Sequence, residues 1–389
     1  MRKTFKWAFL GLLLLVLVAG GAAIWKRDDI SRLLAVNALF DKENIVLNFS
    51  HFDDMFYNTR LELPDNPPSA LPPAPMVMPD LSAWANQRAL TGLVVLKDGN
   101  LVHESYYQGT PDTDLRISWS VAKSFLSALM GIVLEEGAIA SIDDQVTQYA
   151  PALKGSAYDG ASIRNVLNMA SGAHFNEDYL DFNSDINQMG RVLALGGSMD
   201  DFAAGLSTRD RAPGEKWHYV SIDTHILGMV IRGATGRSIP DLMVEKLLAP
   251  LGLEAAPYYV TDGYGVAFVL GGLNLRTRDY ARLGQLFLQN GLWNGAQLVP
   301  AGWVAASTVD SAPDTPDDVG YGFQWWLPAD GREGEFFARG VYGQYIYINR
   351  PAGVVVALNS ADRAFTEGGA NEQNIEMFRT ISEALSTAG

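Results

Sequence analysis

The sequence predicts an α/β (α+β) fold, with an antiparallel sheet flanked by helices and a helical domain inserted between two sets of strands. Two observations predict it. Apolar alternation at 91–109 and at 343–358 is typical of paired strands, and the stretch from Ser118 to about Leu253 has mainly helical spacing. An amphipathic helix over 371–385 closes the chain. This order of elements indicates one sheet that takes strands from both ends of the chain.

Composition narrows the function classes. The chain has 389 residues, of which 48% are hydrophobic and 19% charged, as in a globular protein with a large core. A formal net charge of −15 argues against a nucleic-acid partner. The absence of cysteine excludes disulfides and cysteine-bound metals, and the five histidines lack metal-binding spacing. We therefore expect no metal and no cofactor, and the sequence leaves the oligomeric state open.

Residues 1–27 predict a membrane anchor. Three cations within the first six residues precede an uncharged run from Trp7 to Trp25, which approaches the about 20 residues that a membrane span needs. The positive charge before this run places the N-terminus in the cytoplasm and the catalytic part outside it, on the periplasmic or extracellular side. Alternatively, Ala22-Ala23 ends a cleavable signal peptide, which would give a secreted form.

Residues 28–79 predict an N-terminal extension followed by a proline-rich strap. The spacing at 34–40 indicates a short helix. Seven of the 18 prolines lie between Leu63 and Pro79, a density that excludes a helix or a central strand and favours an extended spacer. The domain boundary is placed there. The main domain is expected over 80–385, with its helical subdomain over about 118–253.

Local signals place further elements in the main domain. Within 91–109, two apolar runs flank Lys97-Asp98-Gly99-Asn100, whose Asp-Gly pair favours a tight primed hairpin turn. Residues 173–185 are polar and acidic and predict a loop. Two late strands are expected at 343–348 and 353–358. Helices are expected at 162–167, 223–233, 239–251 and 277–289.

Ser120 and Lys123 are the first candidates for catalysis. On a helix, their spacing of three puts the hydroxyl and the amine on one face. A serine needs a neighbour that accepts its proton, and a lysine can do so once burial lowers its pKa. The structural alternative is a capping serine followed by a snorkelling surface lysine. The run at 125–133 is apolar nearly all round, which predicts a buried helix and favours the catalytic interpretation.

Two more stretches hold candidate site residues. Tyr219 follows a Pro-Gly turn, and a phenol that faces a lysine can be held partly ionised and relay a proton. Without that context it would be a buried aromatic residue. The glycines within 339–346 let a substrate approach the backbone, or mark a bulge on a strand. The competing motifs are absent: the sequence has neither a Gly-x-Ser-x-Gly elbow nor a phosphate-binding glycine loop.

Three motifs carry a family resemblance. Ser120-Val121-Ala122-Lys123, Tyr219-Val220-Ser221 and Tyr342-Gly343-Gln344 occur in the order and approximate spacing of the motifs of class C β-lactamase-like serine hydrolases. The resemblance covers roughly 80–385 and implies a fold like that of β-lactamases and penicillin-binding proteins. Within this superfamily the chain is most similar to 6-aminohexanoate-dimer hydrolases and related esterases.

The resemblance also implies roles for single residues. Ser120 would be the nucleophile that forms an acyl-enzyme, with Lys123 and Tyr219 as a coupled acid/base pair. The implied oxyanion hole consists of the backbone N–H of Ser120 and one near Gln344. The residues that would meet the substrate are Tyr342, Gly343, Gln344, Ser221 and, from an acidic loop at the entrance, Asp181 together with Glu177 and Asp178.

Two departures from the family pattern bear on the substrate. Ser221 stands where β-lactamases carry Asn, and Val341-Tyr342-Gly343 stands where Lys-Thr-Gly grips a carboxylate. The lost charge-assisted hydrogen bond contributes about 1.5–3 kcal/mol. The sequence therefore predicts a serine hydrolase for amide or ester bonds of small molecules, of the 6-aminohexanoate-oligomer hydrolase or carboxylesterase type. The alternatives are a β-lactamase or D-Ala-D-Ala peptidase, and a non-catalytic module that binds cell-wall peptides.

Overall fold

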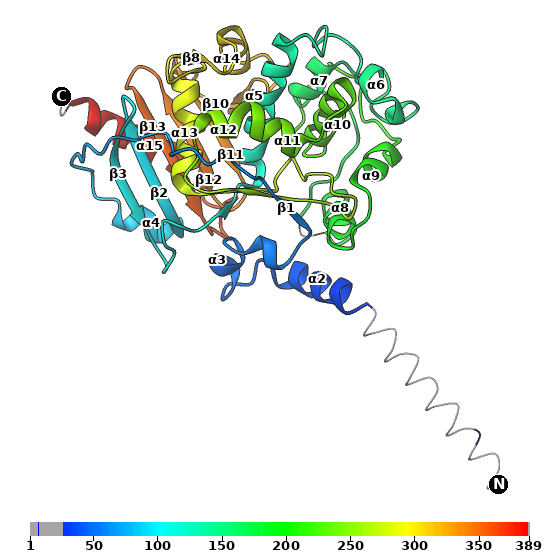
Figure 1. Ribbon diagram of the computed structural model, residues 1–389, viewed down its shortest axis with the longest axis horizontal. Helices are drawn as coiled ribbons and strands as arrows, with labels where there is room; N and C mark the ends of the chain where they lie inside the picture. The colour runs from blue at the N-terminus through cyan, green and yellow to red at the C-terminus, as the bar shows by residue number, and fades with distance from the viewer. Residues whose placement is uncertain (1–6, 8–25, 180, 388–389) are drawn as a thin grey trace.

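A computed structural model describes residues 7, 26–179 and 181–387 (Figure 1). The predicted anchor at 1–27 lies almost wholly outside these residues. Within the described ranges, no helix is both long enough and apolar enough to cross a membrane.

The elements follow the predicted order of strands, helices, strands and helix. The N-terminal third holds α2 (Arg27–Ala38), α3 (Ile45–Asn48), η1 (Phe52–Asp54), β1 (Asn58–Arg60), α4 (Ser82–Gln87), β2 (Leu90–Lys97), β3 (Asn100–Tyr106) and β4 (Arg116–Ile117). The helical block holds η2 (Trp119–Val121), α5 (Ala122–Glu135), α6 (Val146–Tyr149), η3 (Pro151–Leu153), α7 (Ile163–Leu167), α8 (Asp185–Ala194), α9 (Met199–Gly205), α10 (Asp223–Thr235), α11 (Ile239–Met243), η4 (Val244–Leu248) and α12 (Ala249–Leu251). The C-terminal third holds β5 (Tyr258–Val260), β6 (Leu273–Leu275), α13 (Thr277–Leu288), β7 (Leu292–Trp293), β8 (Ala296–Gln297), α14 (Ala301–Ser307), β9 (Val319–Tyr321), β10 (Trp326–Pro328), β11 (Glu335–Gly340), β12 (Gln344–Asn349), β13 (Val354–Ser360) and α15 (Ala370–Thr387).

The main sheet is antiparallel and joins both ends of the chain, as predicted. Its seven strands lie in the order β3-β2-β13-β12-β11-β10-β9, so the early hairpin pairs with a late strand. The predicted primed turn is present: Asp98 and Gly99 between β2 and β3 have φ values of 49° and 81°. The sheet order and the late strands confirm the predicted fold class. The sequence analysis missed β11, which lies between β12 and β10 in this sheet.

Each face of the sheet is covered by helices. On one face, α13 crosses β12 and β13 closely at Gly284, where an added Cβ would lie 2.4 Å from a methyl of Val355. On the other face, α4 and α15 bury a separate apolar cluster that includes Trp84 and Phe378. Figure 1 shows the sheet on one side of the molecule and α6 to α10 on the other. Helix α5 contributes to the larger core, which both parts share.

The N-terminal extension packs against the helical block. A second sheet, β1-β5-β6-β4, ties residue Asn58 to Val260, and α2 contacts α8 (Figure 1). The helix expected at 34–40 instead spans Arg27–Ala38, and ion pairs of Asp29 with Lys26 and Arg32 support its earlier start. The proline-rich strap runs extended along β3, where the N–H of Ala74 donates to the carbonyl of Leu101.

Candidate active site

Ser120 lies in the short turn η2, directly before α5. The residue that precedes it, Trp119, has a φ of 43°, a left-handed conformation that is strained for a bulky side chain. The backbone around this turn is fixed by the N–H of Ser118, which donates to the carbonyl of Leu273 at 2.8 Å. In the first turns of α5, the hydroxyl of Ser124 donates to the carbonyl of Gln324 at 2.7 Å. Hydrogen bonds to two other parts of the chain therefore hold the backbone on both sides of the candidate nucleophile.

Lys123 is buried beside Ser120. Its side chain is 2% exposed, and its Nζ lies 3.2 Å from the Oγ of Ser120 and donates to the carbonyl of Leu270 at 2.8 Å. Burial lowers the pKa of Lys123 to about 7, even though the charges of Glu177 and Asp223 act to raise it. The amine is thus partly neutral near pH 7, as a general base requires.

Asp223 is one of two carboxyl groups near this amine. It begins α10, is fully buried, and accepts hydrogen bonds from the hydroxyls of Tyr158 and Ser171, both at 2.8 Å. Burial raises the pKa of Asp223 to about 7. Its remaining negative charge favours the ammonium form of Lys123 and so opposes the effect of burial. The sequence analysis did not select Asp223, although it lies only four residues after Tyr219.

Tyr219 is the third group beside Ser120. Its backbone is pinned through the neighbouring His218, whose N–H donates to the carbonyl of Met169. The Nζ of Lys123 lies 5.6 Å from the centre of its ring. Burial and the charge of Glu177 raise the pKa of Tyr219, while hydrogen bonding with Ser120 lowers it only in part. The phenol is therefore neutral at pH 7. The partly ionised phenol that the sequence suggested is not favoured, because its site is too desolvated.

Two predicted substrate-binding residues have different surroundings. Ser221 donates both its N–H and its hydroxyl to the carboxylate of Glu177, and burial raises the pKa of that carboxyl. Glu177 is thus half-buried beside the catalytic candidates and does not lie at an open entrance. Asp181 turns back into its own loop, where its carboxylate accepts the N–H of Asn183 at 2.9 Å.

The turn between β11 and β12 closes the site. Gly340 lies against the nucleophile: an added Cβ would come 3.1 Å from the backbone nitrogen of Ser120 and 2.8 Å from the carbonyl of Ser118. Val341 and Tyr342 then line the same cavity as Ser120. The strand that approaches the nucleophile therefore ends in Arg339-Gly340, and the interpretation of Val341-Tyr342-Gly343 as the Lys-Thr-Gly equivalent stays a prediction.

The side chain of Gln344 stabilises the turn between β11 and β12. Its side chain is 1% exposed and donates to the carbonyl of Ser360 at 2.7 Å, while its amide oxygen accepts from Asn359. Gly343 before it has a φ of 84° and packs against Ser360. These contacts fix the turn. The role of Gln344 in an oxyanion hole stays a prediction, and the backbone of Gly340 is the part of this hairpin that meets Ser120.

A cavity of about 130 Å³ opens beside Ser120. Ser221, Tyr342 and Trp119 line it from the main domain. The sequence analysis missed one of its walls, which comes from the N-terminal extension and consists of Val36, Leu39, Phe40, Phe52 and Phe56. The only signal in the sequence was the density of aromatic residues at 40–56, which has no regular period.

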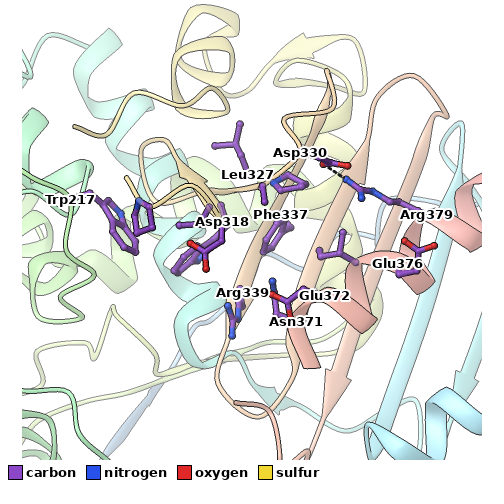
Figure 2. Close-up of a pocket in the computed structure, with 16 residues that line it drawn as sticks. Trp217, Asp318, Leu327, Asp330, Phe337, Arg339, Asn371, Glu372, Glu376 and Arg379 are labelled. Carbon is purple, nitrogen blue, oxygen red and sulfur yellow. Dashed lines mark hydrogen bonds and ion pairs between the residues drawn. The ribbon is translucent and has the colours of Figure 1, made fainter. Parts of the chain in front are cut away.

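A larger pocket of about 500 Å³ does not include Ser120 among its lining residues (Figure 2). It is formed by β10, β11 and α15, and Phe337 and Arg339 of β11 line it together with Asn371 of α15. The guanidinium of Arg339 lies 5.7 Å from the ring centre of Trp326, which in turn packs on Tyr219 at 5.1 Å. Since Ser120 and Lys123 do not line this pocket, the smaller cavity is the candidate active site. In the described ranges, no cluster of His, Asp or Glu side chains is arranged to hold a metal ion.

The sequence matches a known family over most of its length. The profile of the beta-lactamase family matches residues 82–376. The chain belongs to the beta-lactamase family. It is therefore a serine hydrolase, and Ser120, Lys123 and Tyr219 are its candidate catalytic residues. The 6-aminohexanoate-dimer hydrolase of Paenarthrobacter ureafaciens is 28% identical over 298 residues, which cover 73% of this chain and 76% of that protein.

Other relatives span the hydrolases of this family. Penicillin-binding protein 4* of Bacillus subtilis is 28% identical over 36% of this chain and 30% of that protein. A Bacillus anthracis structure, provisionally named a 6-aminohexanoate-dimer hydrolase, superposes with a TM-score of 0.80 at 22% identity, over 90% of this chain and 96% of that one. A penicillin-binding protein from Bacillus halodurans superposes with a TM-score of 0.60 at 14% identity, over 76% and 98% of the two chains. These superpositions establish the fold of beta-lactamases and penicillin-binding proteins.

Proposed function

We propose that this hydrolase cleaves amide or ester bonds of small molecules through an acyl-enzyme on Ser120, as a carboxylesterase or a 6-aminohexanoate-oligomer hydrolase does. The observation that carries the proposal is the pair formed by Ser120 and Lys123. The Oγ of Ser120 and the Nζ of Lys123 lie 3.2 Å apart, and burial lowers the pKa of the amine to about 7. A purely binding module has no need of a desolvated amine next to a serine, so these two facts favour turnover.

The geometry supports a definite proton path. The Oγ of Ser120 attacks the substrate carbonyl carbon while its proton passes to the neutral amine of Lys123. Lys123 keeps one N–H on the carbonyl of Leu270, which leaves its lone pair for the serine. Tyr219, as a neutral phenol, donates a proton to the leaving group and is reprotonated from Lys123. Water then attacks the carbonyl carbon of the acyl-enzyme and gives its proton to the same pair of residues. The acid is released, and Ser120 takes up a proton and is restored.

The negatively charged oxygen of the tetrahedral intermediate needs two N–H donors. One is the N–H of Ser120. We place the second in the turn that follows β11, since Gly340 allows this backbone to approach Ser120 and Val341 lines the cavity. A side chain on Gly340 would push the turn away from the nucleophile. The backbone at Gly340 and Val341 is thus better placed than Gln344 to complete this hole.

The charges near the site disfavour substrates that carry a carboxylate. The side chain of Val341 is uncharged, and the carboxylate of Glu177 accepts a hydrogen bond from Ser221. One observation favours the alternative, a β-lactamase or D-Ala-D-Ala peptidase: the guanidinium of Arg339 lies over Trp326, which packs on Tyr219, and its charge offsets a small part of the rise that burial causes in the pKa of Tyr219. A carboxylate on the leaving-group side could pair with this cation.

Two assays test the proposed function. A fluorophosphonate should label the wild type and leave Ser120→Ala unlabelled. The kcat/KM of the wild type should be higher for nitrophenyl butyrate than for nitrocefin, and Val341→Lys should shift the preference toward nitrocefin. A wild type that prefers nitrocefin would promote the β-lactamase alternative, and Arg339→Ala should then raise the KM for nitrocefin. Absence of labelling on Ser120 would contradict the serine mechanism.

We also propose that residues 1–27 hold the enzyme at a membrane, with the catalytic domain outside the cytoplasm. The support is the uncharged run from Trp7 to Trp25 after a cluster of cations. Membrane fractionation of the full chain and of a form that starts at residue 28 tests it. The full chain should sediment with membranes and the shortened form should not. Recovery of the intact full chain in the soluble fraction would contradict the anchor, and N-terminal sequencing would identify a cleaved form.

A further inference from the structure

One wall of the cavity beside Ser120 comes from outside the family match, which begins at residue 82. Leu39, at the end of α2, is 4% exposed, and Phe52 in η1 is equally buried. Both side chains line the cavity opposite the helical block, where Met189 and Gly190 of α8 form the other side. The extension therefore completes an apolar surface beside Ser120.

The lining is almost entirely apolar. Among the described residues that line the cavity, none is charged, and the polar groups besides the nucleophile are Ser221, Asn187, two tyrosine phenols and the indole N–H of Trp119. The NH2 group of Asn187 donates to the carbonyls of Tyr179 and Asp181. The hydroxyl of Ser221 donates to Glu177. No carboxylate in the described part of the chain lines the cavity, so a cation that enters it meets no side chain of opposite charge there.

The size of the cavity sets the size of its ligand. Its volume is about 130 Å³. An apolar cavity of about 150 Å³ in another protein stays dry and binds benzene. The space beside Ser120 therefore matches a group of about six carbon atoms.

We propose that this cavity is the acyl pocket, that it accepts uncharged apolar acyl groups of about four to six carbons, and that the N-terminal extension sets this preference. The inference rests on the proposed function, since the acyl group is the part of the substrate that stays on Ser120. An acyl chain that ends in an ammonium group would lose its hydration here without gaining a carboxylate partner. Hexanoyl esters should therefore react faster than 6-aminohexanoyl esters, although the latter correspond to the relative's name.

Gly190 offers a way to fill the pocket without strain. It lies within α8, where an added Cβ would meet nothing within 4 Å, and it lines the cavity. Gly190→Leu therefore projects a side chain into the open space, and leucine favours a helix more than glycine does. Leu39→Ala has the opposite effect, because it removes part of the wall. Leu34→Ala on the same helix is the matched control, since Leu34 is 63% exposed.

The experiment compares kcat/KM for nitrophenyl acetate, butyrate, hexanoate, decanoate and 6-aminohexanoate. In the wild type, each methylene up to hexanoate should raise kcat/KM by about fourfold, and 6-aminohexanoate should be a poorer substrate than hexanoate. Gly190→Leu should lose this gain. Leu39→Ala should move the optimum toward decanoate, and Leu34→Ala should match the wild type. A hexanoate-to-acetate ratio that is unchanged in Gly190→Leu would overturn the acyl pocket, as would a wild type that prefers 6-aminohexanoate.

A binding assay separates this inference from the proposed function. Hexanamide should bind to Ser120→Ala in calorimetry and should not bind to Ser120→Ala with Gly190→Leu. If the wild type shows no turnover and no fluorophosphonate labelling, the proposed function fails, and this binding difference still decides whether the pocket holds an apolar chain. If esters are cleaved through Ser120 but neither variant changes the chain-length profile, the pocket fails and the function stands.

Discussion

The two sides of Ser120 are built in different ways. On one side, Lys123 and Tyr219 present titratable groups whose pKa values are shifted by burial. On the other side, Trp119 and Tyr342 present aromatic rings, and Phe49 of the N-terminal extension packs on both, at 5.6 and 5.4 Å between ring centres. The polar side lies wholly within the family match, whereas the aromatic side needs residues that precede it.

The two sides also differ in what holds them in place. The polar side is fixed by hydrogen bonds, such as that from Lys123 to the carbonyl of Leu270. The aromatic side is strained: Trp119 and Tyr342 have φ values of 43° and 60°, and such conformations cost about 1–3 kcal/mol each. Ring pairs contribute about 0.5–1.5 kcal/mol each beyond the area that they bury. Phe40 and Phe49 supply such pairs, so the extension helps to hold the strained backbone on either side of the nucleophile.

The largest effects should come from the polar side, where Lys123 and Tyr219 form one proton-transfer unit. Lys123→Ala and Tyr219→Phe should each lower kcat by about 10²–10⁴-fold. The double variant should lose no more than the worse single one, because groups that act as a unit give non-additive losses. Tyr321→Phe is the control, since the hydroxyl of this buried neighbour has no hydrogen-bond partner. Losses that multiply in the double variant would show that the two residues act independently.

The pH dependence should report the charge of Lys123. The base must be neutral, so with a pKa of about 7 the kcat/KM should fall about tenfold per unit below pH 7. Asp223→Asn removes a negative charge that favours the ammonium form, so the pKa of Lys123 should fall and the acidic limb should move to lower pH. Activity at pH 6, relative to that at pH 8, should therefore rise in Asp223→Asn. An acidic limb that stays in place would show that Lys123 is not the titrating base.

The sequence predicted the polar side better than the aromatic side, for a physical reason. Ser120 and Lys123 are three residues apart in one turn, so local geometry alone brings them together. The order of strands likewise followed from local alternation. Phe40 and Tyr342 are far apart in the sequence, and their stacked contact at 4.7 Å depends on the complete fold. No local pattern records such a contact.

Other details depend on the complete fold for the same reason. Asp181 stays a predicted substrate-binding residue, and its carboxylate accepts a hydrogen bond within its own loop. Gly340 was one of the glycines expected to allow a close approach to the backbone or to mark a bulge, and the fold places it against the backbone of Ser120. The helix expected at 34–40 was misplaced because its start depends on ion pairs of Asp29, which a hydrophobic period does not reveal. In each case a contact outside the periodic pattern decided the role of the residue.

The smallest expected effect on catalysis sharpens the comparison, because it perturbs the aromatic side alone. Phe49 is 3% exposed and contacts Trp119 and Tyr342, yet it does not line the cavity. Phe49→Ala should lower the free energy of unfolding by about 3–5 kcal/mol. It should also lower kcat/KM, by less than Lys123→Ala does, because the strained turn before Ser120 can relax.

Two measurements isolate this effect. Leu47→Ala changes an exposed residue of the neighbouring helix α3 and should leave both stability and kcat/KM unchanged, as urea unfolding and ester hydrolysis would show. The acidic limb of the pH profile of Phe49→Ala should stay where it is in the wild type, since the surroundings of Lys123 are not altered. A shifted limb would mean that the aromatic side also controls the pKa of the base. Unchanged stability and activity would mean that the extension is dispensable for the strained turn.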